Sequence, residues 1–179
     1  MLTNITARRI GLLNDGVKSM GNLRFERFLW MMPAVYALHI LEEYFTRFPA
    51  WMSQHMHASM DNAGFVLNNS LFMAILVSLA VWASRSHSKL AAFAFLAWAS
   101  GNLFWNFVFH LVTTVIADSY SPGLVTAALL YYPVSIWGAV LAVRQGRLGI
   151  AGVVGAFAVG AGLMLFVIWS GLWKFHLPI

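Results

Sequence analysis

The chain places ionisable side chains inside segments that are otherwise almost entirely apolar. His39, Glu42 and Glu43 lie within one such segment and read His-x-x-Glu-Glu. His110 lies within another apolar segment. At about 100° per residue on an α-helix, both carboxylates fall on the same half of the helix as the imidazole. Each group costs several kcal/mol in lipid unless it is paired or hydrated, so these residues indicate a site.

The residue types first suggest metal binding. Neutral imidazoles and carboxylates are the usual nitrogen and oxygen ligands of zinc and of non-haem iron. The two histidines and one of the two glutamates would supply three ligands and leave one position for water or substrate, as catalytic sites do. On this interpretation, the sequence predicts zinc or iron as the cofactor. If the site binds no metal, no cofactor is expected. The candidate metal ligands are His39, Glu42, Glu43 and His110.

The same residues could also act without a metal. In a pocket of low dielectric constant, a histidine and two carboxylates would differ in proton affinity, as a general acid and a general base require. Both interpretations describe a lipid-modifying enzyme, which could be an isomerase, hydratase, cyclase or hydrolase acting on a lipid-like or apolar small molecule. The candidate catalytic residues are His39, Glu42, Glu43, Asn106 and His110.

Other polar side chains fall at the same depth as the histidines. The segment Asn102–Thr114 is polar at every fourth position, which includes Asn106 and His110, and forms one stripe on an apolar helix. At about 1.5 Å per residue, His39, His110 and the pair Asn68–Asn69 lie roughly 9 to 13 Å below one membrane surface. We therefore expect a polar pocket with an outer shell around it. The expected outer-shell residues are Asn68, Asn69, Tyr36 and Thr126.

Two structural interpretations compete with a functional one. Glu43 precedes Arg47 by four residues, the favourable order for a salt bridge at the interface, so Glu43 could be only an anchor. The remaining polar residues could form a hydrogen-bonded clasp between helices, worth about 1 kcal/mol per bond or less. Burying two acids beside two histidines is costly for so small a gain, and a function is therefore favoured over a clasp.

The composition requires that most of the chain lie in lipid. Of its 179 residues 60% are hydrophobic and 9% are charged, whereas soluble chains carry about 25% charged residues. A soluble enzyme is thereby excluded, and the lack of cysteine excludes disulfides and thiolate metal sites. Five continuous apolar stretches can each cross about 30 Å of hydrocarbon as a helix. The predicted spans are Arg27–Phe45, Asn62–Ser84, Lys89–Ala117, Ser121–Val143 and Leu148–Trp173.

The positive charges follow the order of these spans. Nine of the eleven Lys and Arg residues fall before the first span, between the second and third, or between the fourth and fifth. The positive-inside rule therefore places the N-terminus in the cytoplasm. Topology accounts for the net charge of +5, so no nucleic-acid partner is expected. We expect an all-α, multi-pass domain of five helices over residues 27–176 in the cell or cytoplasmic membrane, after a basic interfacial segment over residues 1–26.

Acidic and histidine side chains inside spans also mark ion pathways, so a transporter or proton relay is a third interpretation. The cytoplasmic half of each predicted span is nearly devoid of ionisable groups, and the five spans show no obvious inverted repeat. A pocket that opens to the outer side therefore fits better than a path through the membrane.

Small residues recur four apart in the last span, at Gly152, Ala156 and Gly160. Such a face suits close helix packing, which could occur within the chain or between two copies in a homodimer. The expected partners are therefore membrane lipids, an apolar small-molecule substrate and, as one alternative, a second copy of the chain.

Short polar motifs recur along the chain in a fixed order. They are His39-Ile-Leu-Glu42-Glu43, Phe48-Pro49, Asn106-x-x-x-His110, Tyr120-Ser-Pro122-Gly123-x-x-Thr126 and Pro133. In these motifs the chain resembles the HXXEE family of small integral membrane proteins, over about Pro33 to Pro133. That family is defined by its motif, so the resemblance implies a membrane architecture and the key positions but no substrate.

Overall fold

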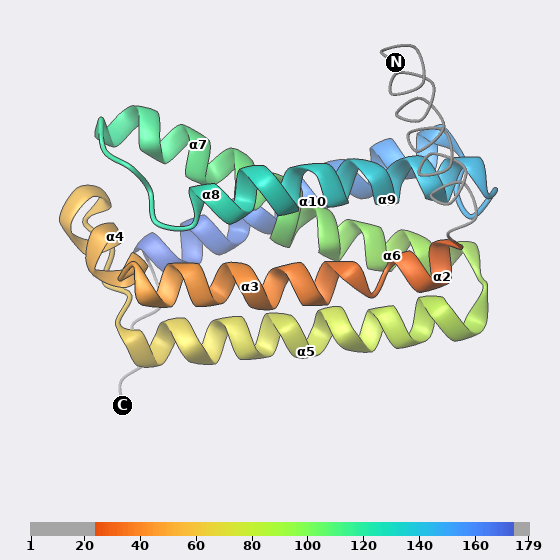
Figure 1. Ribbon diagram of the computed structural model, residues 1–179, viewed down its shortest axis with the longest axis horizontal. Coiled ribbons are helices and arrows are strands. Elements are labelled where there is room, and N and C mark those ends of the chain that lie inside the picture. Colours follow the sequence, from red (N-terminus) through yellow and green to blue (C-terminus); the bar gives the residue numbers. More distant parts are fainter. Residues whose placement is uncertain (1–23, 174–179) are drawn as a thin grey trace, which may run out of the picture.

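The computed structural model describes residues 24–173, and every regular element in that range is a helix. The all-α prediction is confirmed, whereas residues 1–23 of the expected interfacial segment lie outside the described residues. The helices run side by side along the long axis of the molecule (Figure 1). The elements are α2 (Phe25–Phe28), α3 (Met31–Phe45), α4 (Phe48–Met56), α5 (Asn62–Ser86), α6 (Lys89–Ser100), η1 (Gly101–Trp105), α7 (Asn106–Ala117), α8 (Leu124–Thr126), η2 (Ala127–Tyr131), α9 (Tyr132–Arg144) and α10 (Ile150–Trp173).

Four helical segments are long and apolar enough to cross a membrane, and the chain is a multi-pass membrane protein as predicted. Two of them are interrupted by the single π-helical turns η1 and η2, which leave the path of the helix continuous. Their bounds agree with the predicted second to fifth spans within a few residues. The four segments are Asn62–Ser86, Lys89–Ala117, Leu124–Arg144 and Ile150–Ser170.

The expected first span is not one continuous helix. Pro33 has no N–H, and its ring crowds the carbonyl of the residue four positions earlier, Leu29. The chain therefore changes to tighter turns, in which Trp30 N–H donates to Arg27 O at 3.4 Å and Met32 N–H donates to Leu29 O at 3.2 Å. The prediction of an unbroken helix over Arg27–Phe45 was wrong for this reason, and α2 and α3 replace it.

The pair α2–α3 nevertheless extends from one end of the bundle to the other (Figure 1). At one end, Glu26 of α2 contacts Arg147 of the α9–α10 loop at 3.1 Å and His87 of the α5–α6 loop at 3.3 Å. At the other end, α3 leads into α4, whose Trp51 Nε1 lies 3.4 Å from Ser119 Oγ in the α7–α8 loop. The second end is called the α4 end below.

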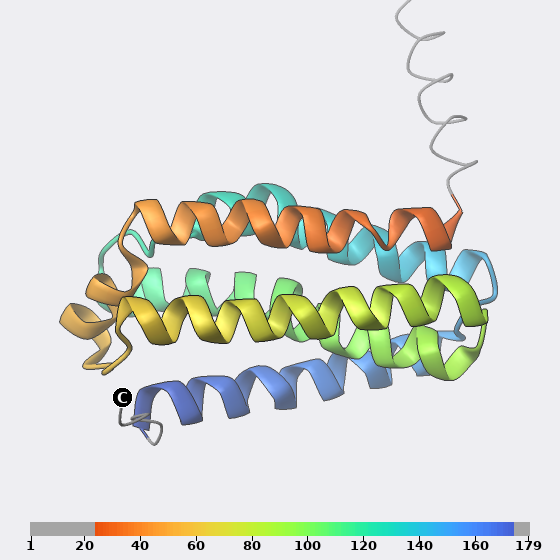
Figure 2. The ribbon, with the colours of Figure 1, turned by 90° about the horizontal axis from the view of Figure 1, so that it is seen from below.

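The small residues of α10 pack inside the chain. Ser100 Oγ donates to Ala156 O at 3.3 Å, and a Cβ added at Gly160 would lie 2.8 Å from both Ala97 O and Gly101 N. Helices α6 and α10 can approach this closely only because no side chain separates them. In Figure 2, α5 and α6 lie between α3 and α10. The homodimer stays a prediction, but two of the three residues proposed for its interface contact α6.

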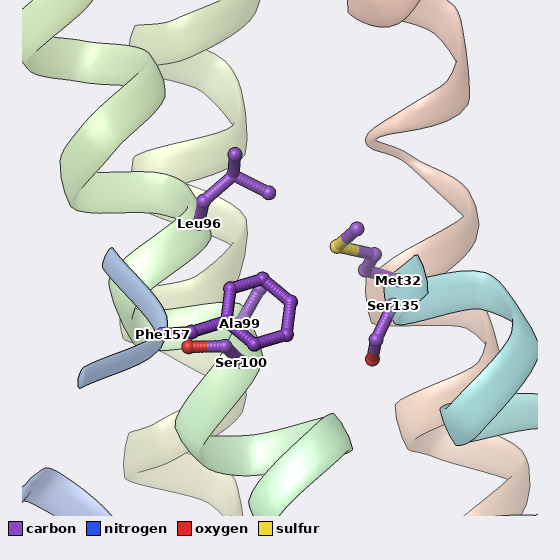
Figure 3. Close-up of a pocket in the computed structure, with 6 residues that line it drawn as sticks. All are labelled: Met32, Leu96, Ala99, Ser100, Ser135 and Phe157. Atoms are coloured by element: carbon purple, nitrogen blue, oxygen red, sulfur yellow. The ribbon is translucent and has the colours of Figure 1, made fainter. Parts of the chain in front are cut away.

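A narrow gap remains in the core between α3, α6, α9 and α10 (Figure 3). It is too narrow to hold a water molecule, and no histidine or glutamate lines it. We interpret this gap as imperfect packing. The candidate site lies elsewhere in the bundle, where polar side chains cluster. The lining residues are Met32, Leu96, Ala99, Ser100, Ser135 and Phe157.

The close approach of α6 and α10 gives a prediction for two neighbouring glycines. Gly160→Ala forces a methyl group against backbone atoms and should lower the free energy of unfolding by about 1 to 3 kcal/mol, measured as a lower thermal midpoint in detergent. Gly162→Ala is the matched control, because a Cβ there meets nothing within 4 Å. Equal midpoints for the two variants would contradict this account of the packing.

Candidate metal centre

Three polar side chains from two helices meet near the α4 end. His39 and Glu43 lie one turn apart on α3, and His110 lies on α7. Glu43 Oε1 is 3.4 Å from His39 Nε2 and 3.3 Å from His110 Nε2. One ligand atom from each of the three residues lies within 4.8 Å of the other two. The sequence spacing predicted the His39–Glu43 proximity, and only the fold brings in His110.

The cluster is enclosed. His39 and His110 are 0% exposed and Glu43 is 4% exposed. Phe48 of α4 packs on one side, with its ring centroid 5.4 Å from that of His110, and Tyr131 packs on another, 4.3 Å from His39. The sequence predicted a pocket open to the outer side. The structure instead encloses these side chains, because α4 and the α7–α8 loop cover the end of the bundle.

A hydroxyl group lies within hydrogen-bonding distance of the Nδ1 atom of each imidazole, whereas the Nε2 atoms face Glu43. His39 Nδ1 lies 2.8 Å from Thr126 Oγ1, and His110 Nδ1 lies 2.9 Å from Ser121 Oγ. Thr126 Oγ1 donates to Gly123 O, so it can accept from the Nδ1–H of His39. That arrangement leaves the Nε2 lone pair of His39 facing the cluster, the tautomer that metal-ligating histidines adopt.

The atoms that face the centre are two imidazole nitrogens and one carboxylate oxygen. Within the described residues, His39 Nε2 and His110 Nε2 are buried without a hydrogen-bond partner. When both imidazoles carry their proton on Nδ1, a carboxylate oxygen and two imidazole lone pairs point at one another, which is unfavourable in a low-dielectric interior. A cation or a proton at the centre would remove the repulsion, so the donor set fits a metal ion.

The two adjacent glutamates have different surroundings. Glu42 points away from the cluster, and its Oε2 accepts from Thr126 N at 2.8 Å while its Oε1 accepts from the Tyr120 hydroxyl. Thr126 N lies in the first turn of α8, where N–H groups lack intrahelical partners and a negative charge is favourable. Glu42 of α3 therefore caps the N-terminus of the neighbouring helix α8. The prediction that it is a metal ligand is not supported by this geometry.

Tyr120 lies in the α7–α8 loop, where partial burial and the neighbouring Glu42 carboxylate raise the pKa of its phenol to about 12. The phenol is therefore protonated at neutral pH and remains a hydrogen-bond donor to Glu42.

The expected Glu43–Arg47 salt bridge does not form. Glu43 is turned inward to the two histidines, and among the described residues no ion pair joins it to Arg47. Arg47 has left the helix, with φ of 60°, and is exposed. The interpretation of Glu43 as a surface anchor was therefore wrong. Helix α3 ends at Phe45, so Arg47 does not lie one helical turn beyond Glu43.

The α7–α8 loop contributes residues that the sequence analysis did not assign to the site. Ser121 is fully buried against His110. Gly123 has φ of 102°, and a Cβ there would lie 2.8 Å from the Cε1 atoms of both His39 and His110. Only glycine permits this approach. The Tyr-Ser-Pro-Gly motif, which overlaps the start of the predicted span Ser121–Val143, was the available signal.

The remaining expected residues divide into near and distant ones. Tyr36 donates to Asn69 Oδ1 at 2.7 Å, and its ring stacks on Tyr131 beside the cluster. Asn106 lies one turn from His110, and its Oδ1 is buried without a partner in the described part of the chain. Asn68 is exposed on α5 and is not near the cluster side of that helix. Of the four expected outer-shell residues, only Thr126 contacts a cluster histidine by a hydrogen bond that the structure records.

Comparison with known proteins gives a family match that covers the cluster residues. The family described as protein of unknown function with HXXEE motif matches residues 30–138. No curated protein and no solved structure matches the chain. The matched region begins at α3 and ends in α9, so it contains the cluster and the loop that covers it. The chain belongs to the HXXEE family.

Proposed function

We propose that His39, Glu43 and His110 bind one zinc or iron ion, and that the protein is a membrane enzyme acting on a lipid-like or apolar small molecule. The observation that carries this proposal is the convergence of two buried, unpartnered imidazole nitrogens on one carboxylate oxygen. Three protein ligands leave a position for water or substrate, which is the pattern of catalytic metal sites.

The spacing of the ligand atoms supports a metal more than a shared proton. Two ligands that each lie about 2.1 Å from a tetrahedral ion are about 3.4 Å apart. The Nε2–Oε1 distances here are 3.3 and 3.4 Å, whereas a charge-assisted hydrogen bond would be about 2.7 to 2.9 Å. When bound, such an ion supplies Lewis-acid chemistry and lowers the pKa of a coordinated water.

The residues around the cluster would prepare it for that task. The hydroxyls of Thr126 and Ser121 hold the imidazoles in one orientation, and such outer contacts raise metal affinity by fixing the ring and its tautomer. Gly123 and Phe48 exclude bulk water from the cluster. Exclusion of water strengthens every electrostatic interaction within the cluster, which favours reaction at the metal over unproductive exchange with solvent.

We also propose that α2–α3 is a fifth span, with the N-terminus in the cytoplasm. The outer face of α3 carries exposed apolar residues at helical spacing, among them Leu38, Leu41 and Phe45, which is 76% exposed. An unbroken apolar stripe of this kind belongs in lipid. With five spans, the basic loops at Arg85–Lys89 and Arg144–Arg147 lie on the same side as Arg24 and Arg27.

Elemental analysis tests the metal site through the adjacent glutamates. The wild-type protein purified in detergent should hold about one zinc or iron per chain, and Glu43→Gln should lower metal affinity at least about tenfold because it removes a ligand. Glu42→Gln is the matched control and should retain the ion, because an amide oxygen can still accept from Thr126 N. A metal-free wild type would favour acid and base catalysis without a metal, and metal loss in Glu42→Gln alone would reverse the assignment.

The hydroxyl contacts give a second measurable expectation. Thr126→Val keeps the shape of the side chain but leaves His39 Nδ1 without its partner, so metal affinity should fall about 10- to 100-fold in a competition titration with a chromogenic chelator. Thr126→Ser should bind the metal almost as tightly as the wild type. Similar affinities for the valine and serine variants would show that the hydroxyl does not orient the ligand.

Topology can be tested directly because the chain has no cysteine. In oriented vesicles with the outer surface exposed, Gln54→Cys in α4 should react with a membrane-impermeant maleimide. Ser86→Cys, at the far end of α5, should react only after the vesicles are permeabilised. Both side chains are exposed in the structure. Labelling of the two positions from the same side would contradict the proposed arrangement.

A further inference from the structure

The cluster is sealed on the side that would face water. Phe48, Trp51 and Met52 of α4 are buried against the bundle, and the α7–α8 loop is held by its contact with α4 at Ser119. Gly123 lies directly on both imidazoles. A water-soluble ligand would have to displace all of these contacts to reach Glu43.

The hydrogen-bonded network of the cluster reaches the surface at a different place. From His39 it passes through Thr126 to Glu42 and then to Tyr120. Glu42 is partly exposed and Tyr120 is 46% exposed. The contact between Glu42 of α3 and Thr126 of α8 places this outlet at the junction of the two helices.

Apolar side chains flank that outlet on both helices. On α3, Leu38 lies one turn from Glu42 on the exposed face. On α8–η2, Val125 and Leu129 are exposed and one turn apart, and Leu129 is 68% exposed. A carboxylate between two lipid-facing stripes is costly unless a donor neutralises part of its charge. Tyr120 supplies that donor in the closed structure.

We infer that the junction of α3 and α8 is a lateral portal through which an amphiphile with a hydroxyl-bearing head group reaches the cluster from the lipid. The inference rests on the proposed function for what happens at the metal, but the portal itself rests on Glu42, Tyr120 and the apolar stripes beside them. When the Tyr120 hydroxyl leaves Glu42, the head group donates to the same carboxylate oxygen, and its tail stays against Leu38 and Leu129. Tyr120 thus closes the portal, and Glu42 is a specificity-determining residue.

Carbodiimide labelling tests the portal without any metal. The protein is reconstituted in phosphatidylcholine vesicles and treated with dicyclohexylcarbodiimide or with a water-soluble carbodiimide, and modified carboxyls are located by peptide mass spectrometry. Glu42 should react several-fold more with the hydrophobic reagent, and Tyr120→Phe should increase that reaction by removing its hydrogen bond. Asp61 and Asp118, which are exposed at the α4 end, should show the opposite preference. Labelling of Glu42 with the same preference as Asp118 would overturn the portal.

Protection against this labelling tests the class of ligand. Dodecanol has both a hydroxyl donor and a tail, 1-methoxydodecane has the tail without the donor, and ethanol has the donor without the tail. Only dodecanol should slow the reaction of Glu42 with dicyclohexylcarbodiimide. Equal protection by 1-methoxydodecane, or no protection by dodecanol, would overturn the proposed head-group recognition. A wild-type protein that lacks metal but passes both labelling tests would refute the metal proposal alone.

Discussion

The site depends on one electrostatic constraint, which is that two imidazole nitrogens and one carboxylate oxygen converge in the buried interior of the bundle. His39 Nε2, His110 Nε2 and Glu43 Oε1 lie within 4.8 Å of one another, and both nitrogens are buried. In an interior surrounded by lipid the repulsion cannot be relieved by solvent. With both Nε2 atoms unprotonated, the arrangement is favourable only with a positive charge at its centre, and the hydroxyls behind the imidazoles keep it from relaxing by ring rotation.

The adjacent glutamates of the motif divide two tasks because they are about 100° apart on one helix. Glu43 turns into the bundle and completes the cluster with His110. Glu42 turns toward α8 and satisfies an N–H of its first turn, which positions Thr126 against His39. The motif thus joins three helices, since α3 contributes both acids, α7 the second histidine, and α8 the hydroxyl that orients the first. Neither glutamate could replace the other without a rotation of α3.

The cluster is covered differently toward water, at the α4 end, and toward the membrane. At the α4 end, aromatic side chains and the Ser121–Gly123 turn exclude water from the cluster, and the turn can lie this close only because Gly123 lacks a side chain. Toward the membrane, at the junction of α3 and α8, the Tyr120–Glu42 hydrogen bond is flanked by exposed leucine and valine side chains. Breaking that one bond disturbs far less packing than moving α4 does. The proposed access from lipid rests on this difference.

The sequence alone determined the class of fold and the identity of most key residues. Apolar stretches separated by charged loops specify membrane helices because lipid cannot satisfy a free backbone, and the cost of buried charge marks His39, Glu43 and His110 as exceptional. Its limits appear at Pro33, where a local clash breaks the first helix, and at Asn68, whose side chain is exposed. Only the tertiary structure decided that Glu43 and not Glu42 completes the cluster, and that Ser121 and Gly123 close it. Those choices depend on the rotation of each helix about its own axis and on the path of a loop, which are set by packing between segments far apart in the chain.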